Sequence, residues 1–166
     1  MLYGPILRST ARVVAAVAAF CCAPSAVSAQ WAPPSPSSAQ SIPVSQLIQP
    51  AELSRMLATH SAEKPLIFQV GSHVMFSQAH IPGAEYAGAA SQDGGAQQLR
   101  ARVAPLPRKT LIVIYCGCCP WNRCPNVGPA YSLLTVMGFT HVKVLYIPEN
   151  FGADWVNRGF PVAGGN

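Results

Sequence analysis

Apolar residues lie along the chain in short blocks that follow two different periods. Residues 66–70, 110–115 and 142–147 are short runs rich in β-branched and aromatic side chains, which is typical of strands buried on both faces. Between these runs the apolar positions recur at helical spacing and predict helices at residues 49–60, 73–78, 92–103, 129–138 and 150–157. Because strands alternate with helices, we expect an α/β fold with a mostly parallel central sheet and helices on both faces.

Local signals place the ends of one helix well. Pro129 suits the first turn of a helix, where its missing N–H has no intrahelical partner to lose. Ala130, Leu133, Leu134 and Met137 follow at helical spacing. Gly138 comes next and can take the left-handed conformation that ends many helices.

The first 29 residues have the pattern of a secretory signal peptide. Arg8 and Arg12 precede an apolar stretch at residues 13–23, no acidic residue occurs, and Val27-Ser28-Ala29 is a small-residue cleavage pattern. The apolar stretch is shorter than the roughly 20 residues of a membrane span. We therefore expect cleavage near Ala29, a periplasmic or secreted protein, and no membrane association of the mature form.

Residues 30–45 differ in composition from the rest. Four prolines, at positions 33, 34, 36 and 43, stand among serine, alanine and glutamine without any charge. Such a stretch buries too little apolar surface to offset its ordering entropy, which predicts a disordered leader. Residues 46–166 then form one domain. The formal charge of +5 comes from scattered lysines and arginines, so nucleic acid is not an expected partner.

The chemistry of the sequence is concentrated in one loop. Cys116 directly follows the strand predicted at 110–115, and Cys118, Cys119 and Cys124 come within the next eight positions. The carboxyl ends of strands in open α/β sheets are the usual ligand edge. A thiolate there, surrounded by loop N–H groups and facing the next helix, should have a lowered pKa. The sequence therefore predicts Cys116 as a nucleophile.

The order of short motifs resembles the single-domain rhodaneses, a family of sulfurtransferases. The matching pieces are His-Ile-Pro-Gly-Ala at 80–84, Tyr115-Cys116, Met-Gly-Phe at 137–139, Val-Lys-Val-Leu at 142–145, Trp155, and Gly-Phe-Pro at 159–161. This resemblance spans about residues 46–162. It implies a rhodanese-like fold and transfer of sulfane sulfur, from thiosulfate or a related donor, through a persulfide on Cys116. It also implies a small sulfur-containing donor and acceptor as partners and no cofactor.

The chain departs from that family pattern in two places. Rhodaneses usually carry an aspartate before the short helix, often with an arginine two residues later, where this chain has Gln69 and Gly71. The cysteine loop is several residues longer than usual, and Arg123 lies seven positions after Cys116. The Cys-x5-Arg pattern of related phosphatases is therefore absent, which argues against phosphate-ester chemistry.

Four loop residues are the candidates for binding an anionic donor. They are Gly117, Trp121, Asn122 and Arg123. Arg123 either binds the donor's negative charge or is a solvated loop charge, and Trp121 would supply an apolar wall or a docking surface. We expect structural roles for His80 and Trp155, and surface positions for the remaining histidines at 60, 73 and 141.

The other three loop cysteines leave several functions open. Cys118, Cys119 and Cys124 are possible second thiols, and a Cys119–Cys124 disulfide is one of three complete pairings. Cys116-Gly-Cys-Cys119 also resembles thiol-disulfide oxidoreductases, which would imply a partner protein. Clustered thiolates suit Cu(I) or Zn(II), but the spacing fits no standard zinc pattern and no histidine is close in sequence, so no metal is expected. A binding module that has lost its chemistry is the last alternative.

Overall fold

The computed structural model describes residues 1, 4, 41–59 and 64–164. The chain divides into residues 1–33 and residues 34–166, and all helices and strands below belong to the second unit. The predicted signal peptide, apart from Met1 and Gly4, and the leader up to residue 40 lie outside the described residues. Within the described part, no helix has the length and apolar content needed to cross a membrane.

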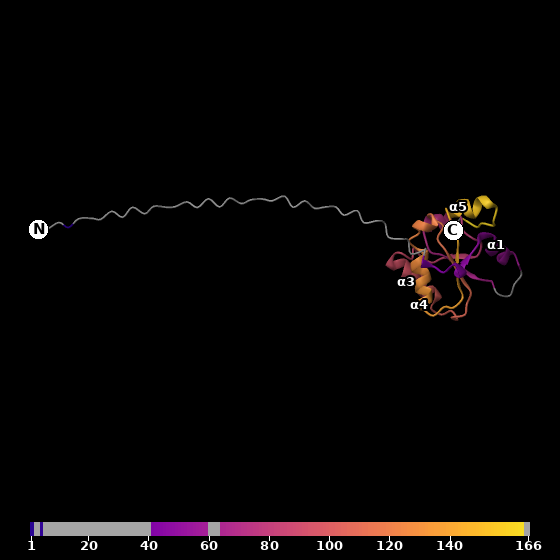
Figure 1. The fold of residues 1–166 in the computed structure, drawn as a ribbon, viewed down its shortest axis with the longest axis horizontal. Coiled ribbons are helices and arrows are strands. Elements are labelled where there is room, and N and C mark those ends of the chain that lie inside the picture. Colours follow the sequence, from indigo (N-terminus) through magenta and orange to yellow (C-terminus); the bar gives the residue numbers. More distant parts are fainter. Residues whose placement is uncertain (2–3, 5–40, 60–63, 165–166) are drawn as a thin grey trace. The chain divides into compact units, whose positions relative to one another are not determined.

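One five-stranded sheet with helices on both faces makes up the domain (Figure 1). All strand pairs are parallel, in the order β1-β5-β4-β2-β3, which confirms the predicted α/β class. The strands are β1 (Leu47–Ile48), β2 (Leu66–Gln69), β3 (Ala84–Tyr86), β4 (Ile112–Tyr115) and β5 (Val142–Leu145). The α-helices are α1 (Pro50–Ala58), α2 (His73–Gln78), α3 (Asp93–Val103), α4 (Val127–Val136) and α5 (Phe151–Asp154).

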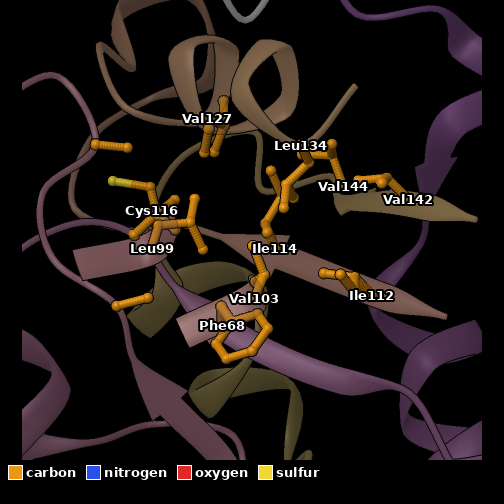
Figure 2. Packing of buried hydrophobic residues seen from close by; sticks show 14 of the residues in the cluster. Phe68, Leu99, Val103, Ile112, Ile114, Cys116, Val127, Leu134, Val142 and Val144 are labelled. Carbon is orange, nitrogen blue, oxygen red and sulfur yellow. The ribbon is translucent and has the colours of Figure 1, made fainter. Parts of the chain in front are cut away.

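Alternation along the strands divides the core into two layers. Phe68, Ile112 and Ile114 face one side of the sheet, where α3 and α4 cover them. Ile67, Val113, Tyr115 and Leu145 face the other side and pack against α1 and α5. Figure 2 shows the first layer, with Cys116 at one end and Ile112 and Val142 at the other. Full burial of each such side chain stabilises the fold by about 1.5–3 kcal/mol.

Ordered structure begins before the boundary expected at residue 46. Ile42 is buried in the first core layer, and Val44–Gln46 forms a turn of 3-10 helix. The next two residues form the edge strand β1, which pairs with β5. A two-residue strand is too short to show a period of two, and the sequence pattern does not predict it.

Helix ends agree with the sequence at α4 and differ near the C-terminus. Pro129 lies in the first turn of α4, and Gly138 follows it with φ of +87°. The helix expected over residues 150–157 is instead α5 followed by the 3-10 helix η4 (Val156–Arg158). The break occurs at Trp155, whose φ of −123° is not helical.

Candidate functional site

Cys116 is the first residue after β4 and lies at the carboxyl edge of the sheet. Its side chain is almost fully buried, with 3% exposed. Gly71, which follows the neighbouring strand β2, comes so close that a Cβ there would lie 2.6 Å from the Cys116 Sγ. The missing side chain at Gly71 therefore leaves the space that the Cys116 sulfur occupies.

Gln69 fixes the backbone on both sides of that space. Its Nε2 donates to the carbonyl oxygen of Cys116 at 3.1 Å, and its Oε1 accepts from the Gly71 N–H at 3.1 Å. The side chain is buried, so each of these bonds replaces contacts with water that folding removes. The two departures from the rhodanese pattern, Gln69 and Gly71, thus act together to hold Cys116.

Asn126 is the only side chain other than cysteine found to hydrogen-bond the Cys116 sulfur within the described residues. Its Nδ2 lies 3.4 Å from the Cys116 Sγ. Its Oδ1 accepts from both the backbone N–H and the hydroxyl of Ser91, at 3.0 and 2.8 Å. Because the oxygen is held by Ser91, the amide must turn its donor toward the sulfur. The sequence pattern does not indicate Asn126 as a site residue, since an asparagine before a helix indicates only a cap.

The four loop cysteines form one sulfur cluster, and all are free thiols in this structure. The Sγ of Cys116 and that of Cys118 share a hydrogen bond at 2.9 Å, and Cys118 lies 3.5 Å from Cys119. The ligand atoms of Cys116, Cys119 and Cys124 are all within 4.8 Å of one another. The structure therefore brings together every cysteine that the sequence analysis singled out.

The pKa values of the four thiols differ from the expectation that Cys116 has the lowered one. Hydrogen bonds to Cys118 and Cys124, together with burial, raise the pKa of Cys116 instead of lowering it. The hydrogen bond from Cys116 lowers the pKa of Cys118 to about 6 and that of Cys124 to about 6. Burial and the nearby charge of Cys124 raise the pKa of Cys119 to about 12. The expected lowering by backbone N–H groups at a helix start occurs at Cys124, which receives the N–H groups of Asn126 and Val127.

A small cavity of about 10 Å³ lies beside the cluster. Its walls are the three sulfur residues Cys116, Cys119 and Cys124, together with Gly117, Trp121, Val127, Leu145 and Ile147. A volume of this size holds about one water-sized body. Two of the four predicted donor-binding residues line it, whereas Asn122 and Arg123 are exposed and do not.

Gly117 and Trp121 attach the loop to the elements after β5. Gly117 has φ of +73°, and its carbonyl accepts from the Phe151 N–H at 2.9 Å. The Trp121 ring stands edge-on to Tyr146 at 5.1 Å, and its backbone N–H donates to the Pro148 carbonyl at 3.0 Å. These contacts set the wall of the cavity that Trp121 was expected to supply.

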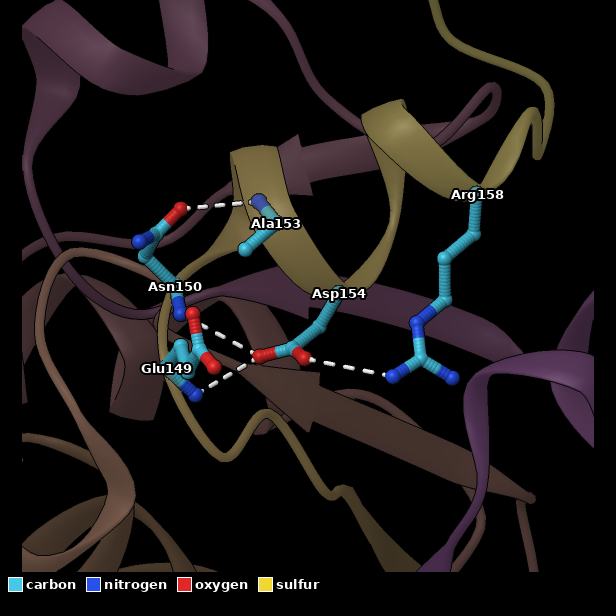
Figure 3. Close-up of polar contacts among 5 residues, drawn as sticks. All are labelled: Glu149, Asn150, Ala153, Asp154 and Arg158. Atoms are coloured by element: carbon cyan, nitrogen blue, oxygen red, sulfur yellow. Dashed lines mark hydrogen bonds and ion pairs between the residues drawn. The ribbon is translucent and has the colours of Figure 1, made fainter.

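Asp154 fixes the turn at the start of α5 (Figure 3). Its buried carboxylate accepts from the backbone N–H groups of Glu149 and Asn150 at 2.7 and 3.2 Å, and lies 3.8 Å from the Arg158 guanidinium. The Asn150 side chain in turn caps α5 by accepting from the Ala153 N–H at 2.9 Å. The start of α5 is therefore held firmly against the cysteine loop.

The other singled-out side chains have structural positions. The Nδ1 of His80 lies 2.8 Å from the Phe76 carbonyl, and the ring stacks on Phe76 at 4.0 Å. Trp155 is fully buried and donates to the Pro161 carbonyl at 2.8 Å. His73 and His141 are exposed, and residue 60 lies outside the described part of the chain.

Comparison with solved structures identifies the architecture. The crystal structure of the Alr3790 protein from Anabaena sp. has a TM-score of 0.56 at 20% identity, covering 71% of this chain and 92% of that one. The solution structure of the rhodanese-like domain of the same protein has a TM-score of 0.53 at 21% identity, covering 72% and 79%. The described domain has a rhodanese-like fold.

The BH2092 protein from Bacillus halodurans is similar to this rhodanese-like domain as well. Its crystal structure has a TM-score of 0.56 at 20% identity, covering 72% of this chain and 77% of that one. No protein-family profile matches the chain, and no curated protein sequence matches it significantly. At these identities the comparisons establish the fold alone.

Proposed function

We propose that this protein is a periplasmic or secreted sulfurtransferase that carries sulfane sulfur as a persulfide on Cys116. The observation that carries the proposal is the position of this cysteine in a rhodanese-like fold. It is the first residue beyond a central strand, with an amide donor, Asn126, directed at its sulfur. The location rests on the signal-peptide pattern of residues 1–29.

The reaction has two nucleophilic steps. The Cys116 thiolate attacks the outer sulfur of a thiosulfonate donor, forming an S–S bond while the donor's S–S bond breaks and its electron pair leaves with a sulfinate, or with sulfite from thiosulfate. An acceptor thiolate then attacks the outer persulfide sulfur, takes it as a new persulfide, and returns Cys116 as a thiolate. No external oxidant or reductant is needed.

Cys116 must lose its proton before the first step, and the cluster supplies a route. Its sulfur shares a hydrogen bond with Cys118 at 2.9 Å. A proton that moves along this bond transfers the negative charge from Cys118 to Cys116 without a base from solvent. The Asn126 amide then stabilises the charge on the Cys116 sulfur.

Space at the site fits a single transferred atom. The cavity beside Cys116 has a volume of about 10 Å³, which is enough for about one water molecule or one atom of similar size. The rest of the donor would stay outside, near the half-exposed Cys118 and Cys119. The exposed Arg123 is the nearby loop cation that we propose for the donor's sulfonate.

Intact-mass analysis with and without thiosulfate tests the proposal. The wild type is expected to gain one sulfur, which cyanide removes, and Cys116→Ser is expected to gain none. Cys118→Ser is the comparison variant, because it removes the proposed proton acceptor and leaves Cys116 in place, so it should gain the same sulfur more slowly. A sulfur gain that persists in Cys116→Ser and disappears in Cys118→Ser would overturn the assignment of Cys116.

Thiol-disulfide exchange is a second candidate function, favoured by one contact. The 2.9 Å approach of the Cys116 and Cys118 sulfurs makes them a pair for reversible oxidation. The pair therefore differs from the Cys116 and Cys119 that the sequence motif indicates. In the same mass experiment, absence of any sulfur gain together with one reducible disulfide containing Cys116 would favour exchange over sulfur transfer.

A further inference from the structure

We propose that Cys116, Cys119 and Cys124 form a three-thiolate site for one Cu(I) ion. The three sulfurs come from the end of β4, the middle of the loop and the turn before α4, and they lie within 4.8 Å of one another. Within residues 41–59 and 64–164, no other group of three histidine, cysteine or acidic side chains converges in this way. Cu(I) binding at this site does not require the sulfur-transfer reaction, although both would use the Cys116 sulfur.

The distances suit one ion among three sulfurs. A metal–thiolate bond is about 2.3 Å long, which sets three sulfurs around a trigonal ion about 4 Å apart. The sulfurs therefore need to move inward by only about 0.5 Å each. All three residues line the same cavity of about 10 Å³, which gives the ion a place to enter.

The identity of the ion follows from the number and kind of ligands. Thiolates are soft ligands that suit both Cu(I) and zinc, but a structural zinc site needs a fourth ligand, so three converging thiolates favour Cu(I). The sulfur of Cys118 lies 2.9 Å from that of Cys116 and 3.5 Å from that of Cys119, but it is outside the set of three sulfurs that all lie within 4.8 Å of one another. Val127, Leu145 and Ile147 belong to the apolar part of the cavity wall.

Neighbouring donors offset the negative charge of the site. The Cys124 sulfur receives the backbone N–H groups of Asn126 and Val127, where α4 begins. The Cys116 sulfur receives the Asn126 side-chain amide. As the ion binds, each new Cu–S bond replaces an S–H bond or joins an existing thiolate, and the displaced protons pass to solvent.

Anaerobic titration of the fully reduced protein with Cu(I), against a chromophoric Cu(I) chelator, tests this site. We expect one ion per chain and three sulfur neighbours by X-ray absorption. Cys119→Ser should weaken binding more than about 100-fold, because it removes a ligand and not merely an outer contact. The Cys118→Ser variant changes an adjacent half-exposed cysteine outside the group, and it should bind Cu(I) as tightly as the wild type does.

Three results would overturn the proposal. They are no stoichiometric binding, equal weakening by Cys118→Ser and Cys119→Ser, and a four-sulfur signal with tighter binding of Zn(II) than of Cu(I). Circular dichroism of both variants checks that neither has simply unfolded. The titration contains no sulfur donor, so its outcome does not depend on whether the protein transfers sulfur.

Discussion

Replacement of Gly71 by alanine tests how the site holds the Cys116 sulfur. The backbone at Gly71 does not lie in the left-handed region, so alanine is compatible with its conformation. The new Cβ would stand 2.6 Å from the Cys116 Sγ, closer than real Cβ contacts, and 3.1 Å from the Gln69 Nε2. The sulfur is the atom that must move.

The structure sets the size of both effects. Overpacking of a buried site by one methyl group costs about 1–3 kcal/mol of unfolding free energy. A displacement of about 1 Å at a reacting atom lowers a rate by about 100-fold. We therefore expect Gly71→Ala to lose about 1–3 kcal/mol by urea unfolding and to form the persulfide about 100-fold more slowly.

A double-mutant cycle separates this clash from a general loss of packing. In a Cys116→Ala background the sulfur is absent, so Gly71→Ala should cost at least about 1 kcal/mol less than in the wild type. Gly94→Ala is the matched control, because nothing lies within 4 Å of a Cβ there, and it should leave persulfide formation unchanged. Equal destabilisation by Gly71→Ala in both backgrounds, with a normal rate of persulfide formation, would refute the reasoning.

Two further substitutions examine the groups that position Cys116. Gln69→Glu should destabilise the fold by about 1–3 kcal/mol in urea unfolding, because a carboxylate cannot donate to the Cys116 carbonyl; unchanged stability would contradict this. Asn126→Asp should slow persulfide formation at least about tenfold in a mass-based time course, because a carboxylate repels the thiolate that the amide now stabilises. Ser91→Ala, which removes one of the two bonds that orient the amide, should slow it less, and the reverse order would contradict this positioning role.

Periodicity predicts most of the fold because most of its elements are long enough to show a period. The buried strands β2, β4 and β5 and the helices α1, α3 and α4 come close to their expected positions. The edge strand β1 has two residues and depends on pairing with β5, which no local pattern encodes. The break between α5 and η4 lies at Trp155, which is fully buried, and no local pattern marks it.

The sequence predicts the reactive residue of the site, Cys116, but not the residues that hold it in place. Cys116 follows from a strand that runs into a loop, which is a local feature of the sequence. Gln69 and Asn126 contact Cys116 across sequence separations of 47 and 10 residues, and only the folded sheet brings them there. The predicted lowering of the Cys116 pKa was wrong. It rested on the N–H groups at a helix start, whereas hydrogen bonds to the neighbouring thiols raise this pKa.

The enlarged loop underlies both the sulfur-transfer and the Cu(I) proposals, because its length brings Cys124 back to the other cysteines. Cys124 returns to the cluster because the loop is long enough to turn at η3 (Trp121–Arg123) before α4 begins, and its sulfur then takes the N–H groups at the start of that helix. Cys116 is thereby left with thiols and the Asn126 amide as its partners. An ion bound by Cys116, Cys119 and Cys124 would occupy the sulfur that attacks the donor. Sulfur transfer and Cu(I) binding at Cys116 therefore exclude each other on any one molecule, and the balance between them depends on the supply of donor and metal.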